Sequence, residues 1–209
     1  VSPVKFGAAR EAREFIKQYE NVENFEVHGY ERFVYQYIRQ EFPKEVDYDI
    51  NQMKIYALDI EVKCENGFPN VEEAAEEMLS ITIKDMVTKK FISWVTREFD
   101  APPNVEMKVF WTEQEMLQDF LTWWAQNTPD ILTGWNVNLY DMPYIARRIN
   151  RILGEKWMKS LSPWNRANER EVYVQGRKNY AYDISGVNIL DYLDLYRKFT
   201  YSNQESYRL

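Results

Sequence analysis

Asp59 and Glu61 are acidic residues near the end of a stretch, residues 53–62, that is otherwise apolar and rich in β-prone side chains. Such a run predicts a strand buried on both faces of a sheet. Side chains alternate across a strand, so both carboxylates are expected on one face, close enough to share one cation. Because buried, unpaired carboxylates are costly and Mg²⁺ and Mn²⁺ prefer oxygen ligands, the pattern suggests a divalent-metal site.

The spacing of the acids leaves a second interpretation open. Asp59 and Glu61 could lie beyond the strand end in solvent, or could pair with Lys or Arg. Asp141 stands where a strand is expected to end and a helix to begin, so its position alone favours a helix N-cap. None of the three acids is assigned a role by spacing alone.

Composition excludes several other kinds of catalytic site. The single histidine, His28, is far from the central region, and the single cysteine is Cys64, so a His-dependent triad lacks its base and both residues are expected to be packing residues. Structural zinc sites need more Cys and His, and the seven glycines lack Walker or dinucleotide-binding spacing. Metal-assisted hydrolysis or a glycosidase-like acid pair remains.

Length and composition predict one good core, or one domain plus part of another. The 209 residues are 45% hydrophobic and 16% aromatic, which is not typical of a disordered chain. A single cysteine excludes an intramolecular disulfide and fits a reducing compartment. The sequence contains no long apolar run and no signal-peptide pattern, so we expect no membrane partner. It begins with Val, and we expect a piece of a longer chain.

The formal net charge of −7 hides an asymmetry. Residues 147–178 contain nine basic and three acidic residues, which gives this segment a charge of +6 and leaves −13 elsewhere. A basic stretch on an acidic body could meet a phosphate backbone near an acidic metal site. A solvated helix face and turn is the alternative.

Hydrophobic periodicity and turn residues predict strands first and then helices alternating with strands, which indicates a mixed sheet with packed helices. Strands are expected at residues 25–37, 53–62, 79–86, 90–99, 107–111 and 130–135. Helices are expected at residues 8–19, in a short acidic turn at 71–77, from the Thr112–Glu115 capping box to Gln126, and from about Pro143, capped by Asp141 or Met142, to Gly154. Residues 170–182 predict a β-hairpin, and residues 187–196 a buried run.

The acids and the segment around Asn136 together resemble the 3′–5′ proofreading exonuclease domain of family B DNA polymerases. The first motif of that family is Asp-x-Glu on a strand, here Asp59 and Glu61. The second is Asn-x(2–3)-Phe/Tyr-Asp, here Asn136 through Tyr140 and Asp141, with one more residue between Asn and Tyr than the tightest form has.

Further runs are similar to the replicative polymerases of T-even-type bacteriophages within that family. They are Asp-Ile-Glu-Val, Phe68-Pro69, Thr-Gly-Trp-Asn, Pro-Tyr-Ile, Ile-Leu-Gly-Glu and residues 189–196. The resemblance implies an α/β fold, an RNase H-like mixed sheet with flanking helices as in DnaQ-like exonucleases. Residues 53–209 would form the exonuclease domain, incomplete at its C-terminus, and residues 1–52 the tail of the polymerase N-terminal domain.

The resemblance also implies roles for single residues. Asp59 would bridge two Mg²⁺ or Mn²⁺ ions, Glu61 and an acid missing here would hold the water-bearing ion, and Asp141 would hold the other. These residues would remove mispaired 3′-terminal nucleotides from DNA. The family's third motif, Tyr-x-x-x-Asp, is absent, because neither Tyr201 nor Tyr207 has an Asp four residues on, so we expect weak or no activity from these residues alone.

DNA contacts follow from the same resemblance. Phe68 would stack on the terminal base, although a loop aromatic covering the core is the alternative. Asn136 and Tyr140 would be substrate-side or scaffold residues. The hairpin would help to separate a frayed primer strand from its template, with Arg177 and Lys178 following phosphates.

The implied partners are the single-stranded 3′ end of primer DNA, the remainder of the polymerase chain and, through it, a sliding clamp. The implied location is the cytoplasm, that of the host cell if the protein is viral. Two other classes of function stay open: a non-catalytic nucleic-acid-binding or split-subunit module, and a carbohydrate-active acid pair, which metal independence would distinguish.

Overall fold

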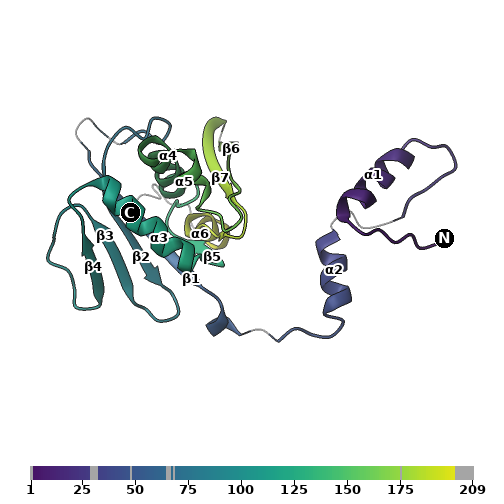
Figure 1. Ribbon diagram of the computed structural model, residues 1–209, viewed down its shortest axis with the longest axis horizontal. Coiled ribbons are helices and arrows are strands. Elements are labelled where there is room, and N and C mark those ends of the chain that lie inside the picture. Colours follow the sequence, from purple (N-terminus) through teal and green to yellow (C-terminus); the bar gives the residue numbers. More distant parts are fainter. Residues whose placement is uncertain are drawn as a thin grey trace. The chain divides into compact units, whose positions relative to one another are not determined.

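The computed structural model describes residues 2–28, 33–47, 49–64, 67, 69–174 and 176–200 (Figure 1). The chain divides into two compact units, Val1–Tyr48 and Asp49–Leu209, and each is considered by itself. None of the helices in these described residues is long and apolar enough to cross a membrane.

The first unit contains two helices, α1 (Ala9–Tyr19) and α2 (Phe33–Glu41). The helix expected at residues 8–19 is confirmed. The strands expected across residues 25–37 are wrong, because residues 25–28 form no strand and α2 covers residues 33–37; residues 29–32 lie outside the described residues. The apolar side chains at 33, 34, 37 and 38 recur at helical spacing, and this periodicity prevails over the β propensity of Phe, Val and Tyr.

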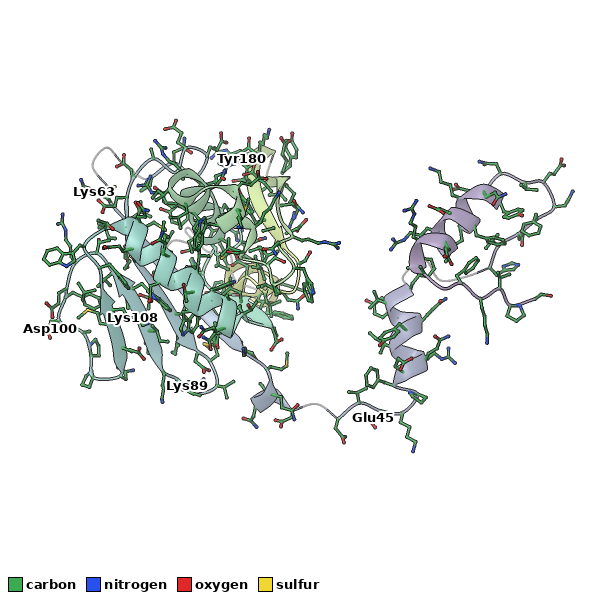
Figure 2. All side chains as sticks on the ribbon, in the orientation of Figure 1. Glu45, Lys63, Lys89, Asp100, Lys108 and Tyr180 are labelled. Carbon is green, nitrogen blue, oxygen red and sulfur yellow. The ribbon has the colours of Figure 1, made fainter. Side chains whose placement is uncertain are left out.

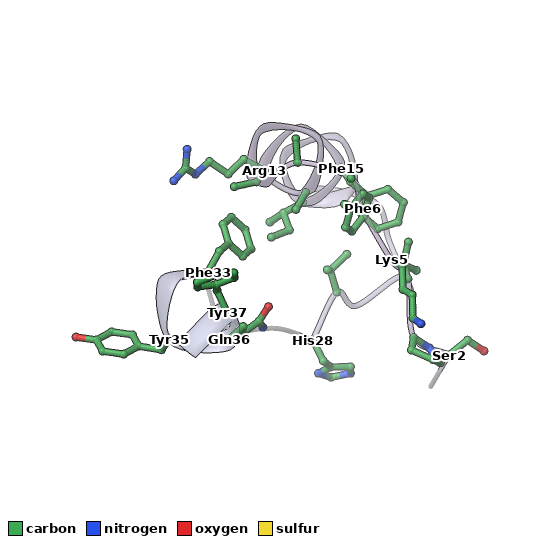
Figure 3. A pocket seen from close by; sticks show the side chains of 18 of the residues that line it. Ser2, Lys5, Phe6, Arg13, Phe15, His28, Phe33, Tyr35, Gln36 and Tyr37 are labelled. Carbon is green, nitrogen blue, oxygen red and sulfur yellow. The ribbon is translucent and has the colours of Figure 1, made fainter. Parts of the chain in front are cut away.

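Aromatic side chains hold the first unit together. The rings of Phe6 and Phe15 lie 5.3 Å apart, and the Arg13 guanidinium lies 5.6 Å from the centre of the Phe33 ring. These residues line a pocket between α1, α2 and the segments beside them (Figure 3). Among the described residues of this unit, only Ala12 is buried, so the unit has little core of its own.

The second unit is built on a six-stranded mixed sheet in the order β4-β3-β2-β1-β5-β8. Its strands are β1 (Ile55–Val62), β2 (Met78–Asp85), β3 (Phe91–Val95), β4 (Val105–Val109), β5 (Ile131–Thr133) and β8 (Asn188–Ile189). The β1–β2 and β2–β3 pairs are antiparallel, and β3–β4, β1–β5 and β5–β8 are parallel. The predicted RNase H-like mixed sheet is confirmed.

Helices pack against this sheet (Figure 1). They are α3 (Glu113–Asn127), α4 (Asp141–Leu153), α5 (Glu155–Lys159) and α6 (Tyr192–Phe199), and a 3-10 turn, η1 (Ile50–Gln52), precedes β1. The predicted capping box at Thr112 and Glu115 is present. The apolar face of α3 that packs into the core is buried and consists of Met116, Leu117, Phe120, Leu121 and Trp124. The helical turn expected at residues 71–77 is wrong, since these residues form bends and turns.

A separate antiparallel hairpin, β6 (Ala167–Val174) and β7 (Arg177–Ile184), confirms the predicted hairpin. It packs on α4, whose Arg147 bonds Glu169 at 2.8 Å and lies 4.3 Å from the centre of the Tyr180 ring. Figure 2 labels Tyr180 on this hairpin. The run expected to be buried at residues 187–196 forms β8 and the first half of α6, and only Val187, Asp191 and Leu193 in it are buried.

Candidate functional site

The two acids of β1 share one face of the strand, as predicted. Tyr56, Leu58 and Ile60 are buried, whereas Asp59 and Glu61 on the opposite face are exposed. The expectation that β1 is buried on both faces is therefore wrong near its end. In the sheet, β5 pairs only with residues 55–57 of β1, so the pairing between these two strands ends before Asp59.

Asp141 reaches β1 from the first turn of α4. Its side chain is 3% exposed, and its Oδ1 accepts a hydrogen bond of 3.2 Å from the backbone N–H of Ile60, between the two acids of β1. The helix N-cap is Tyr140, so the prediction that Asp141 or Met142 caps α4 is wrong. The Asp141 side chain bonds a residue 81 positions away, and does not serve its own helix as a cap.

Burial raises the pKa values of two carboxylates in the site, Asp141 and Asp59. Desolvation, together with the negative charge of Asp59, raises the pKa of Asp141 to about 7. Desolvation also raises the pKa of Asp59. No ion pair joins Asp59, Glu61 or Asp141 to a basic side chain anywhere in the described part of the chain. Within the described residues, the negative charge of these acids is therefore not balanced by an ion pair.

Tyr140 lies beside these carboxylates. Burial raises the pKa of its hydroxyl to about 12, and the negative charges of Asp141 and Glu61 contribute to this shift. The phenol is therefore in its neutral form near neutral pH. Its ring lies 6.0 Å from that of Tyr144, whose own hydroxyl donates to the Glu76 carbonyl at 2.7 Å.

The segment between β5 and α4 needs unusual backbone geometry at two positions. A Cβ on Gly134 would lie 2.5 Å from the carbonyl oxygen of Leu58, so only glycine lets β5 end this close to β1. Asn136 has φ +61°, in the left-handed region that Asn tolerates better than most residues. Its carbonyl accepts from the N–H groups of Leu139 and Tyr140, which starts the turn into α4.

The donor chemistry of the site fits a divalent cation. Its carboxylate oxygens are hard ligands, and a bound cation would offset the charge that burial makes costly. No group of three His, Cys, Asp or Glu side chains is gathered closely enough to hold a metal within the described ranges. The case that a divalent cation suits this site therefore rests on the type and charge of the side chains of Asp59, Glu61 and Asp141.

The remaining predicted site residues have mixed outcomes. Phe68 lies outside the described residues. Arg177 and Lys178 begin β7 at the tip of the hairpin, where the Lys178 ammonium bonds the Glu171 carboxylate at 2.5 Å.

Most of the basic segment 147–178 forms internal contacts. Carboxylate partners pair with Arg147, Arg148, Lys159, Arg170 and Lys178, and Arg151 bonds the Glu73 carbonyl. These contacts reduce the cationic surface that the charge count alone suggests. Cys64 and His28, expected to be packing residues, are both exposed.

Sequence reasoning missed two buried residues, one that holds α4 and one that holds the segment before it. Arg148 of α4 forms two 2.6 Å bonds to Glu113 of α3 and donates to the carbonyls of Ala74 and Ala75. Asp191 accepts backbone hydrogen bonds from the segment that precedes Asp141. Both signals were weak in the sequence, because Arg148 stands in a run of basic residues and Asp191 in an aromatic one.

Comparison with known proteins gives consistent matches. The sequence profile of "DNA polymerase family B, exonuclease domain" matches residues 15–209. The DNA-directed DNA polymerase of Escherichia phage RB69 is 30% identical, over 98% of this chain and 25% of its own. That of Enterobacteria phage T4 is 31% identical, over 100% of this chain and 26% of its own. A DNA polymerase of Pyrococcus glycovorans is 28% identical over 48% of this chain. The chain spans about a quarter of the length of the two phage relatives.

Proposed function

The chain belongs to DNA polymerase family B and contains its exonuclease domain, and from this premise we propose that Asp59, Glu61 and Asp141 form the centre of a 3′–5′ proofreading exonuclease. The substrate is the single-stranded 3′ end of primer DNA, and the reaction is phosphodiester hydrolysis that releases the terminal nucleotide. The observation that carries the proposal is the bond from Ile60 N–H to the buried Asp141 carboxylate, between two acids of one strand.

The proposed site holds Mg²⁺ or Mn²⁺ through carboxylate oxygens of Asp59, Glu61 and Asp141, with two ions when the site is complete. When bound, such cations activate water and stabilise the leaving 3′ oxygen. The chain's own groups hold the ligands in place: the Ile60 N–H fixes one oxygen of Asp141, and the exposed face of β1 leaves Asp59 and Glu61 open to a DNA end.

The DNA contacts of the proposed site are the residues for which the family resemblance implies this role. Phe68 stacks on the terminal base, Asn136 and Tyr140 lie on the substrate side, and Arg177 and Lys178 follow phosphates at the hairpin tip. Since Lys178 is already paired with Glu171, Arg177 contributes more of the phosphate attraction.

The larger assembly is also part of the proposal. The complete gene product is a DNA-directed DNA polymerase that acts in the host cytoplasm and has a sliding clamp as a partner. In this polymerase, residues 1–52 form the tail of the N-terminal domain, and residues 53–209 belong to the exonuclease domain. No Tyr-x-x-x-Asp follows Tyr196 in these residues. We therefore expect these 209 residues alone to hydrolyse DNA more weakly than a polypeptide that supplies this acid.

Release of nucleotides from single-stranded DNA in Mg²⁺ or Mn²⁺ tests the proposal. In the complete gene product, Asp59→Ala should abolish release while the protein stays folded, because Asp59 lies on the exposed face of β1. Asp100→Asn is the matched control, since Asp100 is another exposed acid (labelled in Figure 2). Unchanged hydrolysis by the Asp59→Ala protein, or metal-independent hydrolysis, would contradict the assignment.

A further inference from the structure

Asp191 is a buried carboxylate, 7% exposed, that accepts three backbone hydrogen bonds. Its Oδ1 accepts from the N–H of Leu193 at 2.9 Å, which caps α6, and from the N–H of Asn136 at 3.0 Å. Its Oδ2 accepts from the N–H of Asn138 at 2.9 Å. One bond serves its own helix, and two hold a segment more than fifty residues earlier in the chain.

Neighbouring contacts fix Asp191 at the end of β5. The parallel pairing of β5 with β8 continues past the strands, since Leu190 N–H donates to the Leu132 carbonyl and Tyr192 N–H to the Gly134 carbonyl. The Trp135 ring lies 5.9 Å from the ring of Tyr192 in α6. The first turn of α6 is therefore anchored where the segment leading to Asp141 begins.

The held segment passes directly into the acid of the site. The carbonyl of Asn136 accepts a hydrogen bond from Tyr140 N–H, and that of Val137 accepts one from Met142 N–H. Two turns thus connect the segment that Asp191 holds to α4. Asp141 opens α4 and places its carboxylate on Ile60 N–H. Hydrogen bonds thus connect the Asp191 carboxylate, through the backbone of residues 136–142, to Asp141 and its bond with Ile60 N–H.

We propose that Asp191 is a positioning residue for the exonuclease reaction: by holding the N–H groups of Asn136 and Asn138, it fixes the segment that aims the Asp141 carboxylate at β1. This inference rests on the proposed function. It adds an acid that touches neither substrate nor cation, and that acts through the geometry of another residue.

Asp191→Asn separates this role from helix capping. The substituted side chain keeps one acceptor oxygen for Leu193 N–H, and Asn is as good an N-cap as Asp, so α6 stays capped. Its amide group, however, is a donor and cannot accept from Asn138 N–H. In the complete gene product we expect kcat on single-stranded DNA to fall by at least roughly tenfold, because small misplacements of a reacting group are costly, with KM changed by less than about twofold.

The control is Asp194→Asn, which alters an exposed acid in the same turn of α6 and should leave kcat and KM at their original values. A folded Asp191→Asn protein with unchanged kcat, or one in which only KM rises, would contradict the positioning role. A fall in thermal stability with normal kcat would mean that Asp191 serves the fold alone.

Amide hydrogen exchange of the unsubstituted chain keeps the inference testable even if the variants do not fold. The N–H groups of Asn136 and Asn138 should exchange slowly, as amides bonded to a buried carboxylate do. Rapid exchange at both would overturn the inference. If the unsubstituted gene product shows no metal-dependent hydrolysis, the proposed function fails, and the exchange rates still decide whether Asp191 holds this segment.

Discussion

The Asp141 carboxylate accepts a hydrogen bond from the backbone N–H of Ile60, 81 residues earlier in the chain. This bond joins the start of α4 to the point on β1 where β5 no longer pairs. Asp59 and Glu61 flank Ile60, and because side chains alternate along a strand, both point to the same face of β1. The bond therefore brings Asp141, from the second motif, to the part of β1 that carries Asp59 and Glu61.

Asp141→Asn should stabilise the metal-free protein above neutral pH. The folded-state pKa of Asp141 is raised to about 7, above the unfolded value of about 4, so ionisation favours the unfolded state. The free energy of unfolding should therefore fall as pH rises from about 4 to about 7, by up to roughly 4 kcal/mol at the 1.36 kcal/mol that each pKa unit represents.

Denaturation at pH 5 and pH 8, without and with Mg²⁺, measures this effect. The unsubstituted protein should lose stability between the two pH values and regain it with Mg²⁺, whereas Asp141→Asn should show a smaller dependence on either. Identical pH dependence in the two proteins would show that Asp141 ionises normally in the folded state.

Gly134→Ala should displace the end of β5 from β1. The new Cβ would lie 2.5 Å from the Leu58 carbonyl oxygen, a backbone atom that cannot move alone, so we expect a loss of about 1–3 kcal/mol in stability and lower hydrolysis. Gly7→Ala is the control, because a Cβ there meets only a flexible Glu11 oxygen at 3.6 Å. Equal melting temperatures for both variants would contradict the close approach.

Arg148→Ala should strongly destabilise the second unit. It leaves Glu113, whose side chain is 7% exposed, without its charged partner, and breaking such buried pairs costs about 3–5 kcal/mol. Arg170→Ala breaks an exposed pair with Asp183 and should cost less than about 1 kcal/mol. Urea denaturation of the two variants provides the comparison, and similar losses would mean that the Arg148 pair is not the stronger support.

Arg177→Gln should weaken binding of single-stranded DNA by removing a phosphate contact at the hairpin tip. The slope of log affinity against log salt concentration should decrease in magnitude by about 0.7, the value for one contact to a single strand. Lys178→Gln should change it less, because Lys178 is paired with Glu171. Lys90→Gln, an exposed lysine after the β2–β3 turn, is the control. Unchanged salt dependence for Arg177→Gln would remove the hairpin tip from the DNA path.

The sheet and its main helices were predictable because local signals agree with the final packing. The capping box at Thr112 and Glu115 fixes where α3 starts, and the 3.6-residue periodicity after it marks the face that is buried. The hairpin β6–β7 follows from alternation around a Gly-containing turn. The sequence misleads where two periodicities coincide, as at Phe33–Glu41, where β-prone aromatics are spaced as in a helix.

The candidate acids were identifiable from residue type and motif, but their geometry was not. Asp141 resembles an N-cap in sequence because it stands where a helix is expected to begin. Only the tertiary structure reveals that its carboxylate bonds Ile60 N–H. Asp191 gives only a weak signal, since its partners, Asn136 and Asn138, are more than fifty residues away. Likewise the charge count of residues 147–178 does not distinguish exposed cations from Arg148, which is buried against Glu113.

Binding of Mn²⁺ in solution, followed through the paramagnetic resonance signal of the free ion, tests most directly whether the three carboxylates share a cation. The complete gene product should show saturable binding, weakened at least roughly tenfold in Asp59→Ala and in Asp141→Asn, because each change removes a charged oxygen ligand of the cation. Asp100→Asn should bind as the unsubstituted protein does. Equal Mn²⁺ affinity in all four proteins would contradict the account.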